Sequence, residues 1–433
     1  MKVSFYTLGC KVNQYETEAM GKLFESAGYE ISDEIENADV VVVNTCTVTS
    51  LSSQKSRQII RRMARTNKNS VLVVVGCYAQ SEPEEISKID GVDIIIGTAD
   101  RMKIVELVEQ AFKNRDEKIL KVGAVENISE FEELPHAPHR TRAFLKIEDG
   151  CENFCSYCII PYVRGKVRSR SLESIAAECE KLSADGYKEF VLTGIHIGMY
   201  GKDFKNKISL IDAVKTVLNV ANPFRLRLGS LESAEMTDEL IDLIKNDSRI
   251  CKHVHLPLQS GSDEILKLMH RPYTTKNFSD LTAKLIKNIP EISIGTDLIV
   301  GFPNESEKNF AETTEFVKSQ PFSKIHVFPY SLRAGTVAAS MKNQINTQTK
   351  KFRVSKMLEI SNAKEKIFRE NLIGREVEII AETETDGIFD GLTSNYVRVY
   401  VQSNKKIHSG DIVKVQVEKL FNNGVFGVIS DFH

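Results

Sequence analysis

The feature that most limits the fold of this 433-residue chain is a repeated alternation of short apolar segments with amphipathic ones. Within the first 115 residues, continuous segments rich in Val and Ile alternate with helical patterns. That alternation is typical of a parallel sheet covered by helices on both faces, so we predict an α/β domain over 1–115. The expected strands are 3–9, 38–45, 70–76 and 92–97, and the expected helices are 14–27, 50–66, 83–89 and 100–113.

The same alternation resumes after a polar stretch, 116–141, which we interpret as a linker. Six strand and helix pairs follow, and a long polar helix ends near residue 370. Six pairs are too few for a closed eightfold barrel, so we predict an open (βα)6 partial barrel over 142–370, with an open doubly wound sheet as the alternative. The expected strands are 143–148, 187–194, 224–229, 252–257, 292–301 and 324–330.

The last segment, 371–433, has a different pattern. Apolar and polar residues alternate with a period of two, and Gly and Asn turns separate the segments. This pattern predicts a small antiparallel β-barrel of the oligonucleotide-binding type.

Charge and composition exclude several classes of protein. The chain has 57 Lys and Arg against 59 Asp and Glu, so it does not coat nucleic acid through net charge, although a local basic groove is compatible with this balance. The first residues lack the apolar core of a signal peptide, and the longest apolar runs, 40–43 and 71–75, are too short to span a bilayer. We therefore expect a cytoplasmic protein, in which eight cysteines favour metal or redox chemistry over disulfides.

The sharpest local motif is Cys151, Cys155 and Cys158, spaced C-x3-C-x2-C directly after the strand expected at 143–148. Three thiolates in eight residues can hold three irons of a [4Fe–4S] cluster and leave the fourth iron open. A zinc loop is the alternative, but zinc needs a fourth Cys or His nearby and the loop has none.

A second set of cysteines is spread along the chain. Cys10, Cys46 and Cys77 each follow one of the first three expected strands. In a parallel sheet these positions meet at one edge, where they form a candidate second cluster site. Isolated buried cysteines are the alternative, and we read Cys179 and Cys251 in that way.

Two basic runs lie beside these cysteines and are candidate phosphate contacts, with ordinary solvated surface as the alternative. The first run is Lys55, Arg57, Arg61, Arg62 and Arg65, and the second is Arg164, Lys166, Arg168 and Arg170. Tyr396, Arg398 and Tyr400 are candidate RNA contacts of the small barrel. We interpret His196, His253 and His255 as lining or structural residues.

The loop G-C-E-N-F-C-S-Y-C resembles the signature of radical S-adenosylmethionine enzymes, including the aromatic Tyr157 before its last cysteine. The resemblance implies that the open iron binds S-adenosylmethionine and that one electron splits it to a 5′-deoxyadenosyl radical. It also implies cofactor contacts at strand ends. These candidates are Tyr157, Thr193, Gly194, Ser230, Glu232, Gln259, Ile299 and Gly301.

The whole chain resembles the radical methylthiotransferase family, through blocks such as LGCKVNQYE, NTCTVT, GCYAQ, LTGIHIGMYG, HLPLQSGSDEIL and GTDLIVGFPNE. The resemblance implies two [4Fe–4S] clusters, two S-adenosylmethionine molecules per turnover and a C-terminal TRAM-like RNA-binding barrel. Lys11 and NTCTVT are most similar to the branch that methylthiolates C2 of N6-threonylcarbamoyladenosine at position 37 of tRNA.

The expected partners are a tRNA anticodon stem-loop, a low-potential electron donor and a sulfur donor, with the enzyme a monomer and no membrane involved. Two alternatives use the same chemistry on isopentenyladenosine in tRNA or on an aspartate of a ribosomal protein. An alternative of another class is a non-catalytic iron–sulfur protein that binds RNA or transfers electrons.

Overall fold

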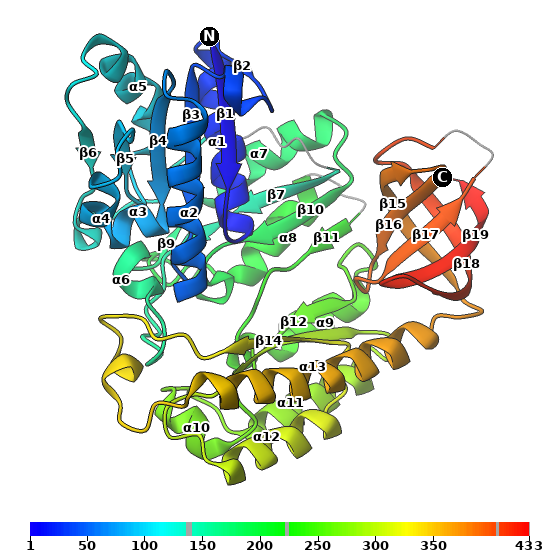
Figure 1. Cartoon of the computed structure of the whole chain (residues 1–433). Helices are drawn as coiled ribbons and strands as arrows, with labels where there is room; N and C mark the ends of the chain where they lie inside the picture. The colour runs from blue at the N-terminus through cyan, green and yellow to red at the C-terminus, as the bar shows by residue number, and fades with distance from the viewer. Residues whose placement is uncertain (136–140, 221–224, 404–406, 433) are drawn as a thin grey trace.

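The structure is a computed structural model that describes residues 1–135, 141–220, 225–403 and 407–432. Figure 1 shows an N-terminal α/β domain, a middle domain with its own parallel strands, and a small barrel at the C-terminal end. None of the helices in the described ranges is long and apolar enough to cross a bilayer.

The N-terminal domain is a six-stranded parallel sheet in the order β2-β1-β3-β4-β5-β6. Its central strands are nearly all Val and are buried on both faces, because side chains alternate between two cores. Helices α1 and α5 cover one face, and α2 and α4 cover the other. The strands are β1 (Lys2–Thr7), β2 (Glu30–Ile31), β3 (Val40–Thr45), β4 (Val71–Gly76), β5 (Ile94–Ile96) and β6 (Ile119–Lys121). The helices are α1 (Lys11–Ser26), α2 (Ser50–Thr66), α3 (Cys77–Ser81), α4 (Pro83–Ser87) and α5 (Ile104–Lys113).

The middle domain has six parallel strands in the order of the sequence, and the open partial barrel is confirmed. It consists of two three-stranded sheets that meet only through single bridges, Leu226 with Ile250 and Ser230 with His255. In the described residues no pairing joins the last strand back to the first. The strands are β7 (Arg142–Lys146), β10 (Glu189–Thr193), β11 (Arg225–Arg227), β12 (His253–His255), β13 (Ser293–Val300) and β14 (Lys324–Pro329).

Helices cover the outside of these strands, and their inner faces form the largest apolar core of the protein. Helices follow the strands, as the six strand and helix pairs predicted. The helices are α7 (Leu172–Ala184), α8 (Leu210–Val220), α9 (Asp238–Asn246), α10 (Asp263–Leu268), α11 (Thr275–Asn288), α12 (Glu307–Ser319) and the long α13 (Thr347–Glu370).

The C-terminal strands form a closed five-stranded barrel in the order β15-β16-β17-β19-β18, as the alternating pattern predicted. Strand β16 contains Asp390 and Gly391, which are residue types that are rare inside strands. Gly391 is needed inside the strand, since a Cβ there would lie 2.3 Å from the Ile380 carbonyl oxygen of the neighbouring strand. The strands are β15 (Glu376–Thr385), β16 (Ile388–Thr393), β17 (Arg398–Gln402), β18 (Ile412–Phe421) and β19 (Gly424–Phe432).

The barrel contacts the middle domain through two buried arginines of β11. Arg227 donates to the carbonyl oxygens of Thr393 and Ser394 at 3.1 and 3.0 Å, and Arg225 donates to that of Leu392 at 2.8 Å. These bonds satisfy backbone acceptors at and just after the end of β16, so they fix the small barrel beside β11 of the middle domain.

The stretch expected as a linker, 116–141, contains structure that its polarity did not predict. Strand β6 lies inside it and pairs with β5, and Glu132 forms an ion pair with the buried Arg101 at 2.5 Å. Residues 136–140 of this stretch, and Phe224 of the expected strand 224–229, lie outside the described residues. The domain boundaries at 115, 141 and 370 remain a proposal.

Candidate active site between two cysteine trios

The three N-terminal cysteines, here called the N-terminal trio, lie at the carboxyl edge of three adjacent strands. Cys10 precedes α1, Cys46 follows β3, and Cys77 begins α3 directly after β4. The loop of Cys10 packs on Cys46, since a Cβ at Gly9 would lie 3.0 Å from the Cys46 Cβ. Cys46 and Cys77 are buried, whereas Cys10 is exposed and open to an incoming group.

The other three cysteines, Cys151, Cys155 and Cys158, are here called the loop trio and lie between β8 (Glu148–Asp149) and α6 (Ile160–Arg164). The expected strand 143–148 ends earlier, at Lys146, because the chain turns into β8 and pairs with β9 (Arg168–Ser169). The loop is held at Ser156, whose N–H donates to the Met269 carbonyl at 3.1 Å and whose hydroxyl donates to the Leu268 carbonyl at 2.7 Å. All three thiols are partly exposed.

The surroundings of the thiols suit a metal cluster. Burial raises the pKa of Cys46 and Cys77, and it raises the pKa of Cys158 to about 12. These thiols are therefore protonated at neutral pH until a metal displaces the protons.

The number and grouping of the thiols bear on which metal they could hold. Within the described ranges, no three Cys, His, Asp or Glu side chains converge on one metal ion. In an iron–sulfur cubane each thiolate binds a different iron, so the thiols stand farther apart than they do around one ion. Six free thiols in two trios fit that chemistry.

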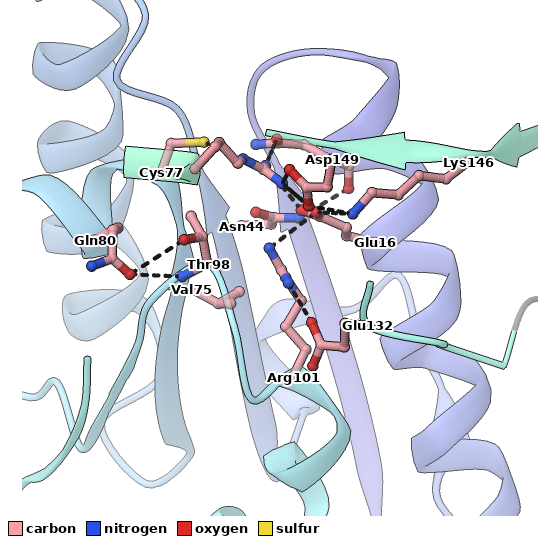
Figure 2. A network of polar contacts seen from close by, with 12 residues as sticks. Glu16, Asn44, Val75, Cys77, Gln80, Thr98, Arg101, Glu132, Lys146 and Asp149 are labelled. Carbon is pink, nitrogen blue, oxygen red and sulfur yellow. Dashed lines mark hydrogen bonds and ion pairs between the residues drawn. The ribbon is translucent and has the colours of Figure 1, made fainter. Parts of the chain in front are cut away.

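A buried network of charges joins the two domains between the trios. Glu16 of α1 forms ion pairs with Arg101 at 3.0 Å, with Lys146 at 3.1 Å and with Arg164 at 2.6 Å. Figure 2 shows Glu16, Arg101, Lys146 and Asp149 pointing toward one another, with Cys77 beside them. Burial alone would raise the pKa of Glu16, but the three cations outweigh it and lower the pKa to about 2. The carboxylate is therefore charged, and it bonds to residues of both domains.

Arg164 lies at the centre of this network and is fully buried. Its Nε lies 3.2 Å from the Sγ of Cys77, and its Nη2 donates to Asn13 at 3.2 Å. Asn13 in turn lies 3.6 Å from the thiol of Cys10. One guanidinium thus contacts one thiol of the N-terminal trio directly and a second through Asn13.

This burial corrects the RNA-contact prediction for the second basic run. Arg164, Arg168 and Arg170 are buried and bond within the protein, Arg168 to the Arg164 and Lys166 carbonyls and Arg170 to Glu178 and Glu133. They are not available to phosphates, and Lys166 is the exposed member of the run. A local charge pattern does not reveal these partners, because the carboxylates of Glu16, Glu133 and Glu178 come from other elements.

The first basic run lies on an accessible surface. Arg57, Arg61 and Arg65 follow one another at a spacing of four along α2 and form a stripe on it. Arg61, Arg62 and Arg65 are exposed, whereas Arg57 also bonds Tyr78 and Glu85. The start of α2 lies beside the loop trio, where the N–H of Ser50 donates to Ser331 at 2.8 Å.

A cavity of about 210 Å³ opens beside Cys158. Three of the expected cofactor contacts, Tyr157, Gln259 and Ile299, line it, and Asp297 and Phe328 are lining residues that the sequence patterns missed. Gln259 lies four residues after β12, the fourth strand of the middle domain. Its φ is +64°, a left-handed conformation that residues with a side chain seldom adopt. An apolar wall with an amide beside it suits a nucleobase.

The other expected contacts are not among the residues that line this cavity. Thr193 is buried, and Gly194 approaches Glu148 so closely that a Cβ would lie 2.7 Å from its carboxylate. Ser230 lines a larger cavity, and at Gly301 a Cβ would lie 2.4 Å from the Lys350 side chain. The structure therefore brings Tyr157, Gln259 and Ile299 together in one cavity. The expected contacts that lie outside it are Thr193, Gly194, Ser230, Glu232 and Gly301.

Glu232 has a role that the sequence did not reveal. It is bonded to Arg271, and Arg271 Nη1 lies 3.2 Å from the Sγ of Cys155. Arg271 was missed because it stands in no recognisable motif. The N-terminal trio has a similar arrangement, in which Arg164 contacts Cys77 and is paired with carboxylates. In each trio, therefore, one arginine that is held by a carboxylate contacts one thiol.

The histidines line the open barrel, as predicted from the sequence. His196 Nδ1 lies 3.6 Å from the Sγ of Cys151, and its Nε2 lies 2.7 Å from Glu235. Burial would lower the pKa of His196, but these two partners raise it to about 10. His253 and His255 project inward from β12, and His255 pairs with Asp297 at 3.1 Å.

Comparison with known proteins identifies the family. Residues 2–97 match uncharacterized protein family UPF0004, and residues 145–317 match the radical SAM superfamily. The chain is 44% identical to the threonylcarbamoyladenosine tRNA methylthiotransferase MtaB of Bacillus subtilis, over 98% of this chain and 96% of the relative. The chain belongs to the radical S-adenosylmethionine tRNA methylthiotransferases. It is therefore an enzyme of this type, as its motifs predicted.

Other methylthiotransferases are similar over most of the chain. The protein of the same name from Aquifex aeolicus is 38% identical over 96% of this chain and all of its own length. A tRNA-2-methylthio-N(6)-dimethylallyladenosine synthase of Clostridium botulinum is 38% identical over 82% of this chain and 80% of its own. Among solved structures, the radical methyltransferase TsrM of Kitasatospora setae has the same fold over 78% of this chain and 77% of its own, with a TM-score of 0.56 at 16% identity. Membership of the family implies S-adenosylmethionine and a [4Fe–4S] cluster as cofactors.

Proposed function

We propose that this methylthiotransferase converts N6-threonylcarbamoyladenosine at position 37 of tRNA into its 2-methylthio derivative. The observation that carries the proposal is the placement of two cysteine trios on either side of one buried charge network. The substrate is taken from the threonylcarbamoyladenosine tRNA methylthiotransferases that are 44, 38 and 35% identical to nearly the whole chain.

Each trio is assigned one [4Fe–4S] cluster. Cys151, Cys155 and Cys158 would hold the cluster that binds S-adenosylmethionine, and Cys10, Cys46 and Cys77 would hold an auxiliary one. When bound, these clusters supply reductive cleavage of S-adenosylmethionine and a site for the sulfur to be transferred. The exposure of Cys10 and the partial exposure of the loop trio leave room for exchangeable groups on the open irons.

The residues around the loop trio position the cofactor and the reacting base. Tyr157, Gln259 and Ile299 would enclose the adenine of S-adenosylmethionine in the 210 Å³ cavity. Arg271 orients Cys155 through its bond to the thiol, and Glu232 holds Arg271 in place. The apolar wall excludes water from the space between the cofactor and the substrate.

The RNA would lie across α2 and the small barrel. Arg61, Arg62 and Arg65 offer exposed cations along α2, and the residues just before α2 line the cavity beside Cys158. Unpaired anticodon-loop bases can be splayed out at little cost. A low-potential electron donor and a sulfur donor complete the reaction, and the enzyme is expected to act as a monomer in the cytoplasm with its tRNA.

The test is mass spectrometry of tRNA nucleosides from cells that lack this protein. We expect the 2-methylthio group to disappear while N6-threonylcarbamoyladenosine remains, and the parent chain but not a Cys46→Ala variant to restore it. Loss of 2-methylthio-isopentenyladenosine instead would assign the substrate of the Clostridium botulinum relative. An unchanged set of tRNA nucleosides, with a methylthiolated ribosomal-protein aspartate lost, would move the target to protein.

A further inference from the structure

A second cavity, of about 570 Å³, lies where all three parts of the chain meet. His253, His255 and Asp297 line it from the open barrel, Tyr396 from the small barrel and Lys11 from the start of α1. Its volume falls in the range of small-molecule sites, about 300–1,000 Å³. We call it the lumen cavity.

The lumen cavity has lining residues in the neighbourhood of both trios. Lys11 directly follows Cys10 of the N-terminal trio, and Asp297 also lines the smaller cavity beside Cys158 of the loop trio. A group held in the lumen cavity would therefore lie between the two expected clusters, where the target base has to be.

Lys11 is distinctive among the cations of this wall. Arg142 is paired with Glu382 at 2.9 Å, and Arg227 is paired with Glu189 at 2.8 Å. For the Lys11 ammonium, the described part of the chain offers no hydrogen-bond acceptor and no carboxylate within ion-pair distance. A partly buried cation without an anion is costly, so it points to an anion that arrives with the substrate.

Near Lys11, the wall of the lumen cavity also carries a fixed aromatic ring and an unused polar atom. Tyr396 has φ +67°, and its ring lies 4.6 Å from the Arg227 guanidinium and 4.7 Å from the His253 ring. This left-handed backbone persists only where the surroundings hold it, so Tyr396 is a rigid wall. His253 Nδ1 is buried and finds no hydrogen-bond partner in the described residues. It therefore has a free position for a hydroxyl or an amide.

We infer that the lumen cavity is a specificity site for the N6 substituent of the target adenosine, with Lys11 binding its carboxylate and His253 a neighbouring hydroxyl or amide. The inference rests on the proposed function and deepens it. A threonylcarbamoyl group carries a carboxylate, a hydroxyl and an amide, so it complements these groups. An isopentenyl group would leave the ammonium unpaired, and sites built for hydrogen bonding discriminate against such analogues.

The test measures the affinity of anaerobic, cluster-loaded, full-length enzyme for anticodon stem-loops that differ only at position 37. The bases are adenosine, N6-threonylcarbamoyladenosine, its neutral methyl ester and isopentenyladenosine. We expect the parent to bind the threonylcarbamoyl loop about tenfold more tightly than the ester or the unmodified loop, a typical effect of one charge-assisted bond.

Three variants separate the charge of Lys11 from its shape. Lys11→Met should reduce the preference to about twofold or less, and Lys11→Arg should keep most of it. Lys22→Met changes a partly exposed lysine on the same helix that pairs with Glu25, and it should behave as the parent. Iron content is measured in each sample, so that damage to the cluster is not mistaken for lost recognition.

The outcomes distinguish this inference from the proposed function. If the parent forms 2-methylthio-N6-threonylcarbamoyladenosine but Lys11→Met keeps the full preference, the specificity site is overturned and the proposed function stands. Equal loss of preference in Lys11→Arg and Lys11→Met would also overturn it, because the position would then act through shape. If the parent makes no such product and shows no preference, both are overturned.

Discussion

The guanidinium Nε of Arg164 lies 3.2 Å from the Sγ of Cys77, so a side chain from the middle domain contacts a thiol of the N-terminal domain. The same guanidinium bonds Glu16 of α1 and Asp149, which stands two residues before Cys151. The two trios are therefore coupled through one fully buried cation. Their relative position depends on it as much as on the apolar contacts between the domains.

Removal of this cation should destabilise the protein strongly. In Arg164→Met the carboxylates of Glu16 and Asp149 lose a buried partner, and breaking such a pair costs about 3–5 kcal/mol. Anaerobic urea unfolding measures the free energy. Arg61→Met, on the exposed face of α2, should stay within about 0.5 kcal/mol of the parent. Equal stabilities of the two variants would show that the network contributes little.

The buried carboxyl of Glu148 should make the stability depend on pH. Burial raises the pKa of Glu148 to about 8, while its carboxylate accepts from the His196 N–H at 2.6 Å. Between pH 5 and pH 8 the unfolded chain has lost this proton and the folded chain retains it. Stability should therefore fall as the pH rises, by about 1.4 kcal/mol per pH unit, and level off above pH 8.

The Glu148→Gln variant isolates this contribution. The free energy of unfolding of this variant and of the parent is measured with urea at pH 5.5, 6.5 and 7.5. It should fall less steeply with pH in the variant, by about 1.4 kcal/mol per pH unit, because one proton fewer is released on unfolding. Glu126→Gln, at an exposed carboxyl, serves as the control and should follow the parent. Parallel curves for the parent and Glu148→Gln would mean that Glu148 is ionised in the folded protein.

The exposed arginines of α2 should contribute to tRNA binding through charge alone. Arg61→Ala together with Arg62→Ala should weaken binding and reduce the slope of log Kd against log salt by about one for each side chain. Lys287→Ala on α11, which lies in the lower part of Figure 1 away from α2, is a charge-matched control for one side chain. An unchanged salt dependence in the double variant would remove α2 from the proposed RNA surface.

Sequence patterns were sufficient where local composition determines the structure. The Val runs of β3 and β4 predicted a sheet covered on both faces, since only such strands are apolar throughout. The six strand and helix pairs predicted the open barrel for a similar reason. Strand β6 was missed because it is three residues long and lies in a polar segment, and only its pairing with β5 reveals it.

The side-chain environment was less predictable than the elements. Arg164 was interpreted as a surface cation because nothing near it in the sequence shows that Glu16, 148 positions away, approaches it in the fold. The roles of Arg271 and Lys11 could not be predicted from the sequence for the same reason. They depend on whether groups that are distant in the sequence pair with these side chains in the fold. The cysteines were easier, because a thiol at the end of each adjacent strand has a position that the topology fixes.

Iron counting combined with an assay of 5′-deoxyadenosine tests the central claim most directly. Anaerobically loaded parent enzyme should hold about eight irons per chain, and Cys46→Ala and Cys155→Ala should each hold about four. Cys46→Ala should still cleave S-adenosylmethionine after reduction but form no methylthiolated tRNA, whereas Cys155→Ala should do neither. Cys251→Ala, at a buried thiol outside both trios, should keep both clusters and both activities. A parent with only four irons, or a Cys46→Ala variant that retains all eight, would contradict the account.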